Sequence, residues 1–218
     1  MRIRADFDVP AVVAADEHDW VASPEAGVER VMLDRIGEEV AVATSIVRYA
    51  PGSRFAPHRH DRGEEFFVLD GVFADEHARY PKGTYVRNPA GTVHSPRSDE
   101  GCLLFVKLRQ FAPGDGAHFA IDTTRFGPPV CTNGAVGVRR LHRFRREDVL
   151  IVDGAAGREI TFDPIDVPRE CLVIDGTIDV AERRLTRLGW LRMPAGRAMR
   201  LRFDTAGQVL IKSRPVLE

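Results

Sequence analysis

Residues 52–98 read GSRFAPHRHDRGEEFFVLDGVFADEHARYPKGTYVRNPAGTVHSPRS, and this segment contains the pattern that best indicates the fold. His58 and His60 lie two positions apart, and Glu64 opens an apolar run that is typical of a strand. Successive side chains of a strand alternate faces, so the two histidines point the same way, about 7 Å apart along the chain. Glu64 has the same parity, so all three side chains can meet at one point.

A second group of turn residues supplies a fourth side chain. Gly83, Pro89 and Gly91 form a turn that delivers His94 from a distant part of the chain. Three neutral imidazoles and one carboxylate suit zinc, iron, manganese, nickel or copper, and the lack of cysteine among them argues against a thiolate site. A metal that prefers five or six ligands would keep open positions here for water or substrate.

Other polar residues compete for roles at this site. Glu65 competes with Glu64 for the carboxylate position, but alternation predicts that Glu65 points to the opposite face. Tyr85, Arg87 and Lys107 are candidates for groups around the metal, and Arg87 or Lys107 could bind an organic acid. Alternation alone leaves open whether these three side chains face the metal or are outward strand charges.

The spacing of these glycines, proline, histidines and glutamate resembles both motifs of the cupin superfamily, from Gly52 to His94. The stretch from GEEFFVLDG to LLFVKLRQF is similar to the cupin domain of the ChrR type, which is the regulatory half of certain anti-sigma factors and also occurs in free-standing proteins. The resemblance covers roughly residues 45–125 and implies one divalent metal per chain, with zinc favoured and iron, manganese or nickel as alternatives. The implied ligands are His58, His60, Glu64 and His94.

Composition describes an ordinary globular protein. The chain has 218 residues, 44% of them hydrophobic and 29% charged, which suffices for two small domains. It contains no apolar run of membrane-spanning length, and its first residues lack the features of a signal peptide, so we expect a cytoplasmic protein without membrane contact. The three cysteines, Cys102, Cys131 and Cys171, are expected to be reduced thiols.

The pattern of apolar runs and turns predicts an all-β jelly roll. Valine and isoleucine are frequent, and glycine, proline or aspartate marks a turn about every ten residues, without a convincing amphipathic helix. The net charge of −1 argues against general nucleic-acid binding. A basic run, Arg139 to Arg146, could contact nucleic acid or an acidic protein, but such a run is more often a solvated strand edge or part of an interface with an acidic neighbouring domain.

The second half of the chain repeats the first in weakened form. A shift of 105 residues places Gly52 on Gly157 and Gly71 on Gly176. We therefore expect two cupin (double-stranded β-helix) domains, residues 1–125 and 126–218. The second is expected to be degenerate and without metal, because the four ligand positions become Asp163, Ile165, Arg169 and Met199.

Two functions remain open from the sequence. The ChrR resemblance implies a metal-binding regulatory or sensor module related to anti-sigma factors and transcription regulation. The separate zinc domain that holds the sigma factor in that family has no counterpart in this sequence, so sigma-factor contact is not supported. The alternative is a metal-dependent cupin enzyme, such as a dioxygenase acting on a small organic ligand. Resemblance also suggests a homodimer; no catalytic residue is assigned.

Overall fold

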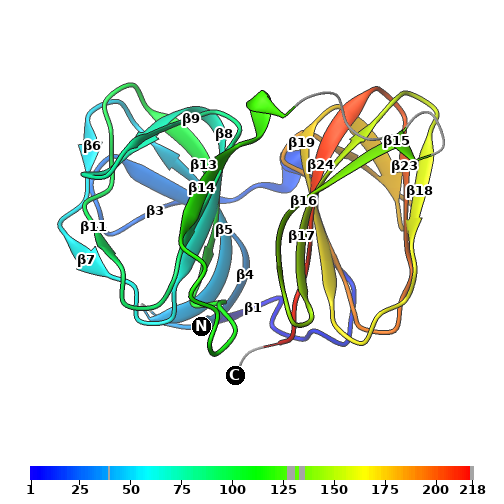
Figure 1. Ribbon diagram of the computed structural model, residues 1–218, viewed down its shortest axis with the longest axis horizontal. Coiled ribbons are helices and arrows are strands. Elements are labelled where there is room, and N and C mark those ends of the chain that lie inside the picture. Colours follow the sequence, from blue (N-terminus) through cyan, green and yellow to red (C-terminus); the bar gives the residue numbers. More distant parts are fainter. Residues whose placement is uncertain (39, 127–130, 133–135, 217–218) are drawn as a thin grey trace. The chain divides into compact units, whose positions relative to one another are not determined.

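The chain forms two compact β units. The computed structural model describes residues 1–38, 40–126, 131–132 and 136–216 (Figure 1). One unit comprises Met1–Ala5 and Asp19–Phe126, and the other comprises Asp6–His18 and Gly127–Glu218. Within the described ranges, helix is confined to two 3-10 turns, η1 (Ala15–Glu17) and η2 (Thr123–Arg125). The predicted all-β class is confirmed.

The main sheet of the first unit contains its longest strands. The strand order is β1-β4-β5-β13-β8-β10-β14, and β3 (Trp20–Ala22) pairs beside β4. Phenylalanine, valine and leucine fill the central strands, as expected for strands with buried faces. The bounds are β1 (Arg2–Ile3), β4 (Val28–Gly37), β5 (Ala41–Tyr49), β13 (Cys102–Leu108), β8 (Glu64–Ala74), β10 (Thr84–Asn88) and β14 (Phe119–Asp122).

Strand β8 bends from this sheet into the opposite layer of the unit. Its residues up to Gly71 pair with β13, whereas its last three residues pair with β9 (Arg79–Pro81). The bend requires glycine, because Gly71 has φ +67° and a Cβ there would lie 2.1 Å from the carbonyl oxygen of Gly101. Short paired strands complete this layer, namely β6 (Ser53–Arg54) with β12 (Arg97–Ser98) and β7 (His58–Arg59) with β11 (Val93–His94).

The second unit has the same strand order. Its larger sheet runs β15-β16-β17-β24-β19-β22-β2 and its smaller sheet β18-β23-β20-β21. The bounds are β2 (Ala11–Val13), β15 (Cys131–Thr132), β16 (Val136–Phe144), β17 (Glu147–Gly154), β18 (Glu159–Phe162), β19 (Arg169–Asp175), β20 (Thr177–Val180), β21 (Arg183–Thr186), β22 (Trp190–Met193), β23 (Met199–Phe203) and β24 (Gly207–Ser213). The path β16-β17-β24-β19-β22 thus matches β4-β5-β13-β8-β10 of the first unit.

The N-terminal arm contributes to the second unit. Strand β2 pairs with β22, and Asp6–His18 groups with the later residues of the chain rather than with residues 19–126. The sequence predicts that the chain divides into two independent domains between residues 125 and 126, and this division stays a prediction. Residues 112–135 are rich in glycine and proline, which predicts a connector, and this segment falls partly outside the described residues, at 127–130 and 133–135.

A cluster of charged residues supports the repeat beyond its glycines. In the first unit a glutamate of β8 pairs in register with an arginine of β10 and a lysine of β13, and the second unit repeats this across β19, β22 and β24. All six residues are buried. The shift of 105 residues relates Glu65 to Glu170, Arg87 to Arg192 and Lys107 to Lys212.

The described cysteines are free thiols. Cys102 and Cys171 are buried and unpaired, and burial raises the pKa of Cys102 to about 11. The side chain of Cys131 lies outside the described residues. In the part of the chain that the structure describes, no helix has the length and apolar character needed to cross a bilayer.

Candidate metal centre

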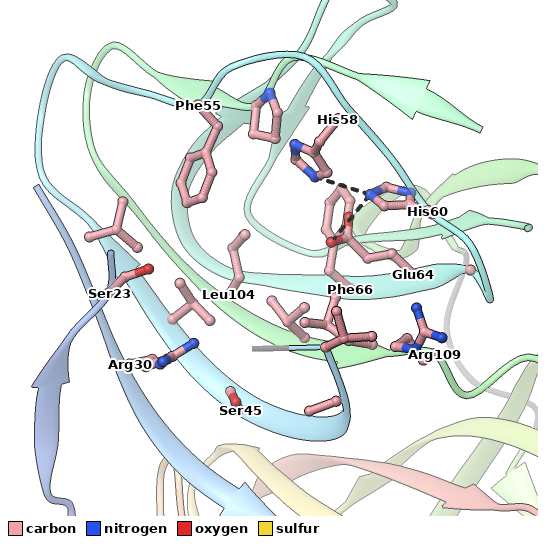
Figure 2. Close-up of a pocket in the computed structure, with 18 of the residues that line it drawn as sticks. Ser23, Arg30, Ser45, Phe55, His58, His60, Glu64, Phe66, Leu104 and Arg109 are labelled. Carbon is pink, nitrogen blue, oxygen red and sulfur yellow. Dashed lines mark hydrogen bonds and ion pairs between the residues drawn. The ribbon is translucent and has the colours of Figure 1, made fainter. Parts of the chain in front are cut away.

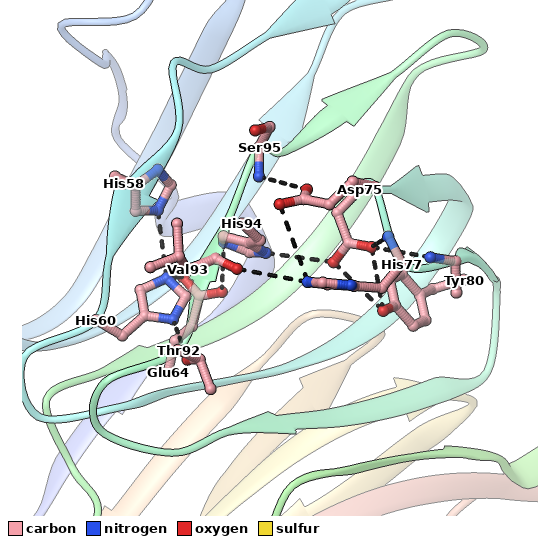
Figure 3. Close-up of polar contacts among 12 residues, drawn as sticks. His58, His60, Glu64, Asp75, His77, Tyr80, Thr92, Val93, His94 and Ser95 are labelled. Atoms are coloured by element: carbon pink, nitrogen blue, oxygen red, sulfur yellow. Dashed lines mark hydrogen bonds and ion pairs between the residues drawn. The ribbon is translucent and has the colours of Figure 1, made fainter.

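The structure brings together the four side chains that the sequence selects. His58 lies on β7 and pairs with His94 on β11, while Glu64 is the first residue of β8. His60 directly follows β7, and its backbone is held by the turn after Pro89, since its amide donates to Thr92 and its carbonyl accepts from Gly91. One ligand atom from each of His58, His60, Glu64 and His94 lies within 4.8 Å of the others (Figure 3).

The donor atoms of the four side chains converge on one point. The Nε2 atoms of His58 and His60 are 3.3 Å apart. The Glu64 carboxylate lies 3.7 Å from His60 Nε2 and 3.6 Å from His94 Nε2. The centroids of the three imidazole rings lie between 4.6 and 5.1 Å from one another. This spacing leaves room for a single ion between the four groups.

Hydrogen bonds on the far side of each ring determine which nitrogen carries the proton. His58 Nδ1 lies 3.1 Å from the carbonyl oxygen of Ala56, which can only accept. His60 Nδ1 lies 3.2 Å from Thr92 Oγ1, and that hydroxyl already donates to the Pro89 carbonyl at 2.8 Å. Both Nδ1 atoms must therefore donate, so each neutral ring presents a bare Nε2 lone pair to the centre.

His94 is oriented in the same way by a carboxylate. Its Nδ1 lies 3.4 Å from Asp75 Oδ2, so the Nδ1–H donates and Nε2 is left as an acceptor. Asp75 is itself held by the amides of His77 and Ala78, at 2.8 and 3.0 Å, and by the Tyr80 hydroxyl at 3.3 Å (Figure 3). A carboxylate behind a ligating histidine fixes the ring and increases its basicity.

The pKa values of these groups follow from burial and from the nearby charges. Burial lowers the pKa of His60, more than Glu64 raises it. Burial also lowers the pKa of His94, but its hydrogen bond to Asp75 and the charge of Glu64 outweigh that effect, so the pKa is raised. For Asp75, hydrogen bonds from His94 and from backbone amides outweigh burial, and the pKa is lowered.

The donor set fits a divalent transition metal. Three Nε2 lone pairs and a carboxylate face one another, and His94 Nε2 is buried without a hydrogen-bond partner within the described residues. Such an arrangement of acceptors repels itself unless a cation lies between them. Three imidazoles and one carboxylate are suitable ligands for zinc, iron, manganese or nickel.

Glu65 and the three candidate neighbours lie on the other face of the sheet. Glu65 accepts hydrogen bonds from Tyr85 and Arg87, at 2.7 and 2.6 Å, and Arg87 also pairs with Asp115 at 2.6 Å. Lys107 is paired with Glu65 in strand register and donates to a threonine of β5. The expectation that Arg87 or Lys107 binds an organic acid at the metal is therefore wrong, because cross-strand register places both beside Glu65 and away from Glu64.

A cavity of about 340 Å³ adjoins three of the four convergent side chains, His58, His60 and Glu64 (Figure 2). Its walls are largely apolar, and its polar lining includes residues that the sequence pattern did not single out, above all Arg30, Arg35 and Arg109. Tyr49 also lines the cavity, and burial, followed by the charge of Glu64, raises its pKa well above the usual value. This phenol stays protonated and can donate a hydrogen bond to a bound molecule.

The equivalent positions of the second unit present no such set of donors. Arg169 stands in place of Glu64 and donates to the Asp163 carbonyl at 3.0 Å. Met199, in place of His94, is 1% exposed and belongs to the apolar core of this unit. A cationic guanidinium and an apolar core residue leave these four positions unsuited to a cation.

Three arginines of the basic run on and just after strand β16 form ion pairs within the second unit. Arg139 contacts Asp153 at 2.5 Å and Arg140 contacts Asp148 at 2.6 Å. Arg146, just past the strand, contacts Asp166 at 2.6 Å. These ion pairs favour a solvated strand over a surface reserved for an acidic partner.

Comparisons with known proteins agree with this geometry. The family model described as ChrR Cupin-like domain matches residues 8–112. No curated protein sequence matches the chain significantly.

Solved structures share the fold along almost the whole chain. The nickel(II) complex of the pirin YhhW from Escherichia coli has a TM-score of 0.73 at 13% identity and covers 96% of this chain and 100% of its own. A protein from Nostoc punctiforme, provisionally assigned as a dioxygenase, has a TM-score of 0.72 at 15% identity, with 96% and 80% covered. The manganese-containing oxalate decarboxylase of Bacillus subtilis has a TM-score of 0.64 at 12% identity, with 93% and 76% covered. The chain has the cupin fold, and its residues 8–112 match the family model of the ChrR Cupin-like domain.

Proposed function

We propose that the first unit binds one divalent transition metal through His58, His60, Glu64 and His94 and presents it to a small organic molecule in the adjoining cavity. The observation that carries this proposal is the convergence of three histidine Nε2 lone pairs, each set by a hydrogen bond at Nδ1, on one carboxylate. When bound, the metal supplies Lewis acidity and open coordination positions. The chain itself supplies the ring orientation, through Asp75, and the apolar walls that limit access of water.

Zinc is the ion that the ChrR resemblance favours. The same donors accept iron, manganese or nickel, and relatives of the fold were solved with nickel(II) and manganese(II). The identity of the ion separates the two proposed roles. Zinc suits a regulatory or sensor module, which the ChrR match supports, whereas redox-active iron suits an oxygen-using enzyme.

A metal-dependent enzyme is the second candidate function, and one structural feature supports it. The cavity adjoins His58, His60 and Glu64, so a molecule in it would lie beside the metal. An enzyme of the dioxygenase type would consume oxygen when the iron-loaded protein meets its substrate, and a sensor module would bind the same ligand without turnover. We further propose a cytoplasmic homodimer that contacts neither nucleic acid nor, through this chain alone, a sigma factor.

The test is elemental analysis of protein purified without chelator. We expect one metal per chain, lost in His60→Ala and retained in His118→Ala, a matched control because His118 is exposed and outside the cluster. Two metals per chain, or none, would refute the proposal. Equal metal content in the two variants would refute the ligand assignment.

A further inference from the structure

Arg30 of β4 lines the cavity as a cation without a protein partner (Figure 2). Its Nε is buried and has no hydrogen-bond partner, and no ion pair joins its side chain to a carboxylate anywhere in residues 1–38, 40–126, 131–132 and 136–216. A guanidinium carries five N–H donors and stays charged. Arg30 is half-buried, so its donors are available to an anion bound in the cavity.

A β-bulge directs a second guanidinium to the same side. Arg30 pairs with Val47 of β5, and the register then shifts between Met32 and Asp34. The extra residue reverses the alternation, so Arg35 faces the cavity as Arg30 does, although the two are an odd number of positions apart. Burial lowers the pKa of Arg35, and the charge of Arg30 lowers it further, as expected for two neighbouring cations.

The charges around the cavity favour an anionic ligand. Two carboxylates face it, and neither is available to Arg30. Asp61 pairs with Arg109 at 3.2 Å, and Glu64 is directed at the histidines. The arginines that line the cavity are Arg30, Arg35, Arg59 and Arg109. Positive charge thus exceeds negative charge even before a divalent metal is added.

The distance between Arg30 at one end of the cavity and the metal-ligand residues at the other limits the shape of the ligand. Along the sheet, Arg30 lies opposite Val47 of β5, Val47 lies opposite Leu104 of β13, and Leu104 lies opposite Val68 of β8. The backbone of Arg30 is thus three strand spacings, about 14 Å, from β8 and reaches it four residues past Glu64, or about 13 Å further along that strand. Figure 2 shows Arg30 across the cavity from His60 and Glu64, with Leu104 between. One carboxylate cannot contact both ends.

We propose that the cavity binds a monocarboxylic acid with an apolar body, its carboxylate paired with Arg30 and its other end directed at the four metal-ligand residues. The body packs on Val47, Leu104 and Val106, which line the wall between the two ends. A cavity of about 340 Å³ is at the small end of ligand pockets, which suits an acid of medium chain length. The inference rests on the proposed metal centre, because it names the ligand class of the same cavity.

The test is calorimetric titration of the metal-loaded protein with straight-chain acids from butanoate to decanoate, and with 1-hexanol as the uncharged match of hexanoate. We expect the acids to bind with an optimum at intermediate length and hexanoate to bind at least tenfold more tightly than 1-hexanol. Arg30→Gln should weaken hexanoate tenfold to a hundredfold and leave 1-hexanol unchanged, whereas Arg30→Lys should retain much of the affinity. Arg79→Gln is the matched control, because Arg79 is exposed and pairs outside the cavity with Glu100.

The outcomes separate this inference from the proposed metal centre. Equal affinity for hexanoate and 1-hexanol, no binding of any acid at 10 mM, or full hexanoate affinity in Arg30→Gln would overturn the inference while metal content stays at one per chain. Wild-type protein that holds no metal but binds hexanoate through Arg30 would overturn the metal centre and support the carboxylate subsite. If Arg30→Gln does not fold, the wild-type preference for acid over alcohol and the Arg30→Lys variant decide.

Discussion

Replacing Asp75 by asparagine tests whether the proton on His94 is placed by its carboxylate partner. In the wild type, Asp75 Oδ1 accepts from the amides of His77 and Ala78, while Oδ2 faces His94 Nδ1 and the Tyr80 hydroxyl. An asparagine would keep its amide oxygen toward the two backbone donors. Its NH₂ would then face His94 Nδ1, which favours the tautomer with the proton on Nε2, directed at the metal position.

The expected loss of metal affinity follows from the geometry of the hydrogen bond between Asp75 and His94. Loss of a partner that orients a ligand typically weakens metal affinity tenfold to a hundredfold, or by about 1.4 to 2.7 kcal/mol. The distance from Asp75 to His94 Nδ1 is 3.4 Å, at the long end of a hydrogen bond, so we expect the lower half of that range. The local fold should persist, because asparagine retains the acceptor for both backbone amides.

Competition against a colorimetric chelator at fixed pH measures this effect, with thermal melting of the metal-free protein as the check on folding. Asp70→Asn is the matched control, since it removes the same charge from an exposed position on β8, the strand that ends just before Asp75. Asp75→Asn protein that melts like wild type and binds metal within twofold of wild-type affinity would refute the tautomer argument.

Three further outcomes are expected. Glu64→Gln should lose most of the metal, which metal analysis checks. Glu65→Gln should keep the metal but lose about 3 kcal/mol of unfolding free energy, because it breaks the buried ion pair with Arg87. Metal analysis and urea denaturation check this second variant. Met199→His should not create a second metal site, since Arg169 remains at the carboxylate position, and a stoichiometry of two per chain would contradict this. The pKa of His94 is raised above 6.5 in the folded protein, so protonation of His94 stabilises the metal-free protein below pH 6.5. This stabilisation is lost as the pH rises through the raised pKa. Metal affinity falls as the pH drops through the same pKa, because protons compete with the metal for His94. The melting temperatures of metal-loaded and metal-free protein should therefore diverge as the pH rises from 6.5 through the raised pKa of His94, and a constant difference across that range would contradict the assignment.

The sequence was sufficient for the framework of the site. Strand alternation selected Glu64 over Glu65, and the turn around Pro89 and Gly91 predicted that His94 would join the two earlier histidines. The structure places all four side chains accordingly. The convergence could be predicted because alternation and turn chemistry are local properties that one chain segment determines, and the role of the four residues as metal ligands stays a prediction.

The sequence alone could not predict which face of the sheet Arg87 and Lys107 occupy. Each lies on its own strand, and only the pairing of β10 and β13 with β8 shows that both are beside Glu65. Register between strands depends on long-range pairing, which alternation within one strand does not reveal.

The all-β framework, the four ligand candidates and the absence of such donors 105 residues later could all be predicted from the amino-acid sequence. The environment of the candidate metal centre became visible only in the folded chain. Asp75 behind His94, Thr92 behind His60 and the unpaired Arg30 at the far end of the cavity come from separate strands and turns. The physical reason is that a ligand set held on paired strands follows local spacing, whereas proton positions and charge balance depend on which distant groups the folded sheets bring within a few ångströms.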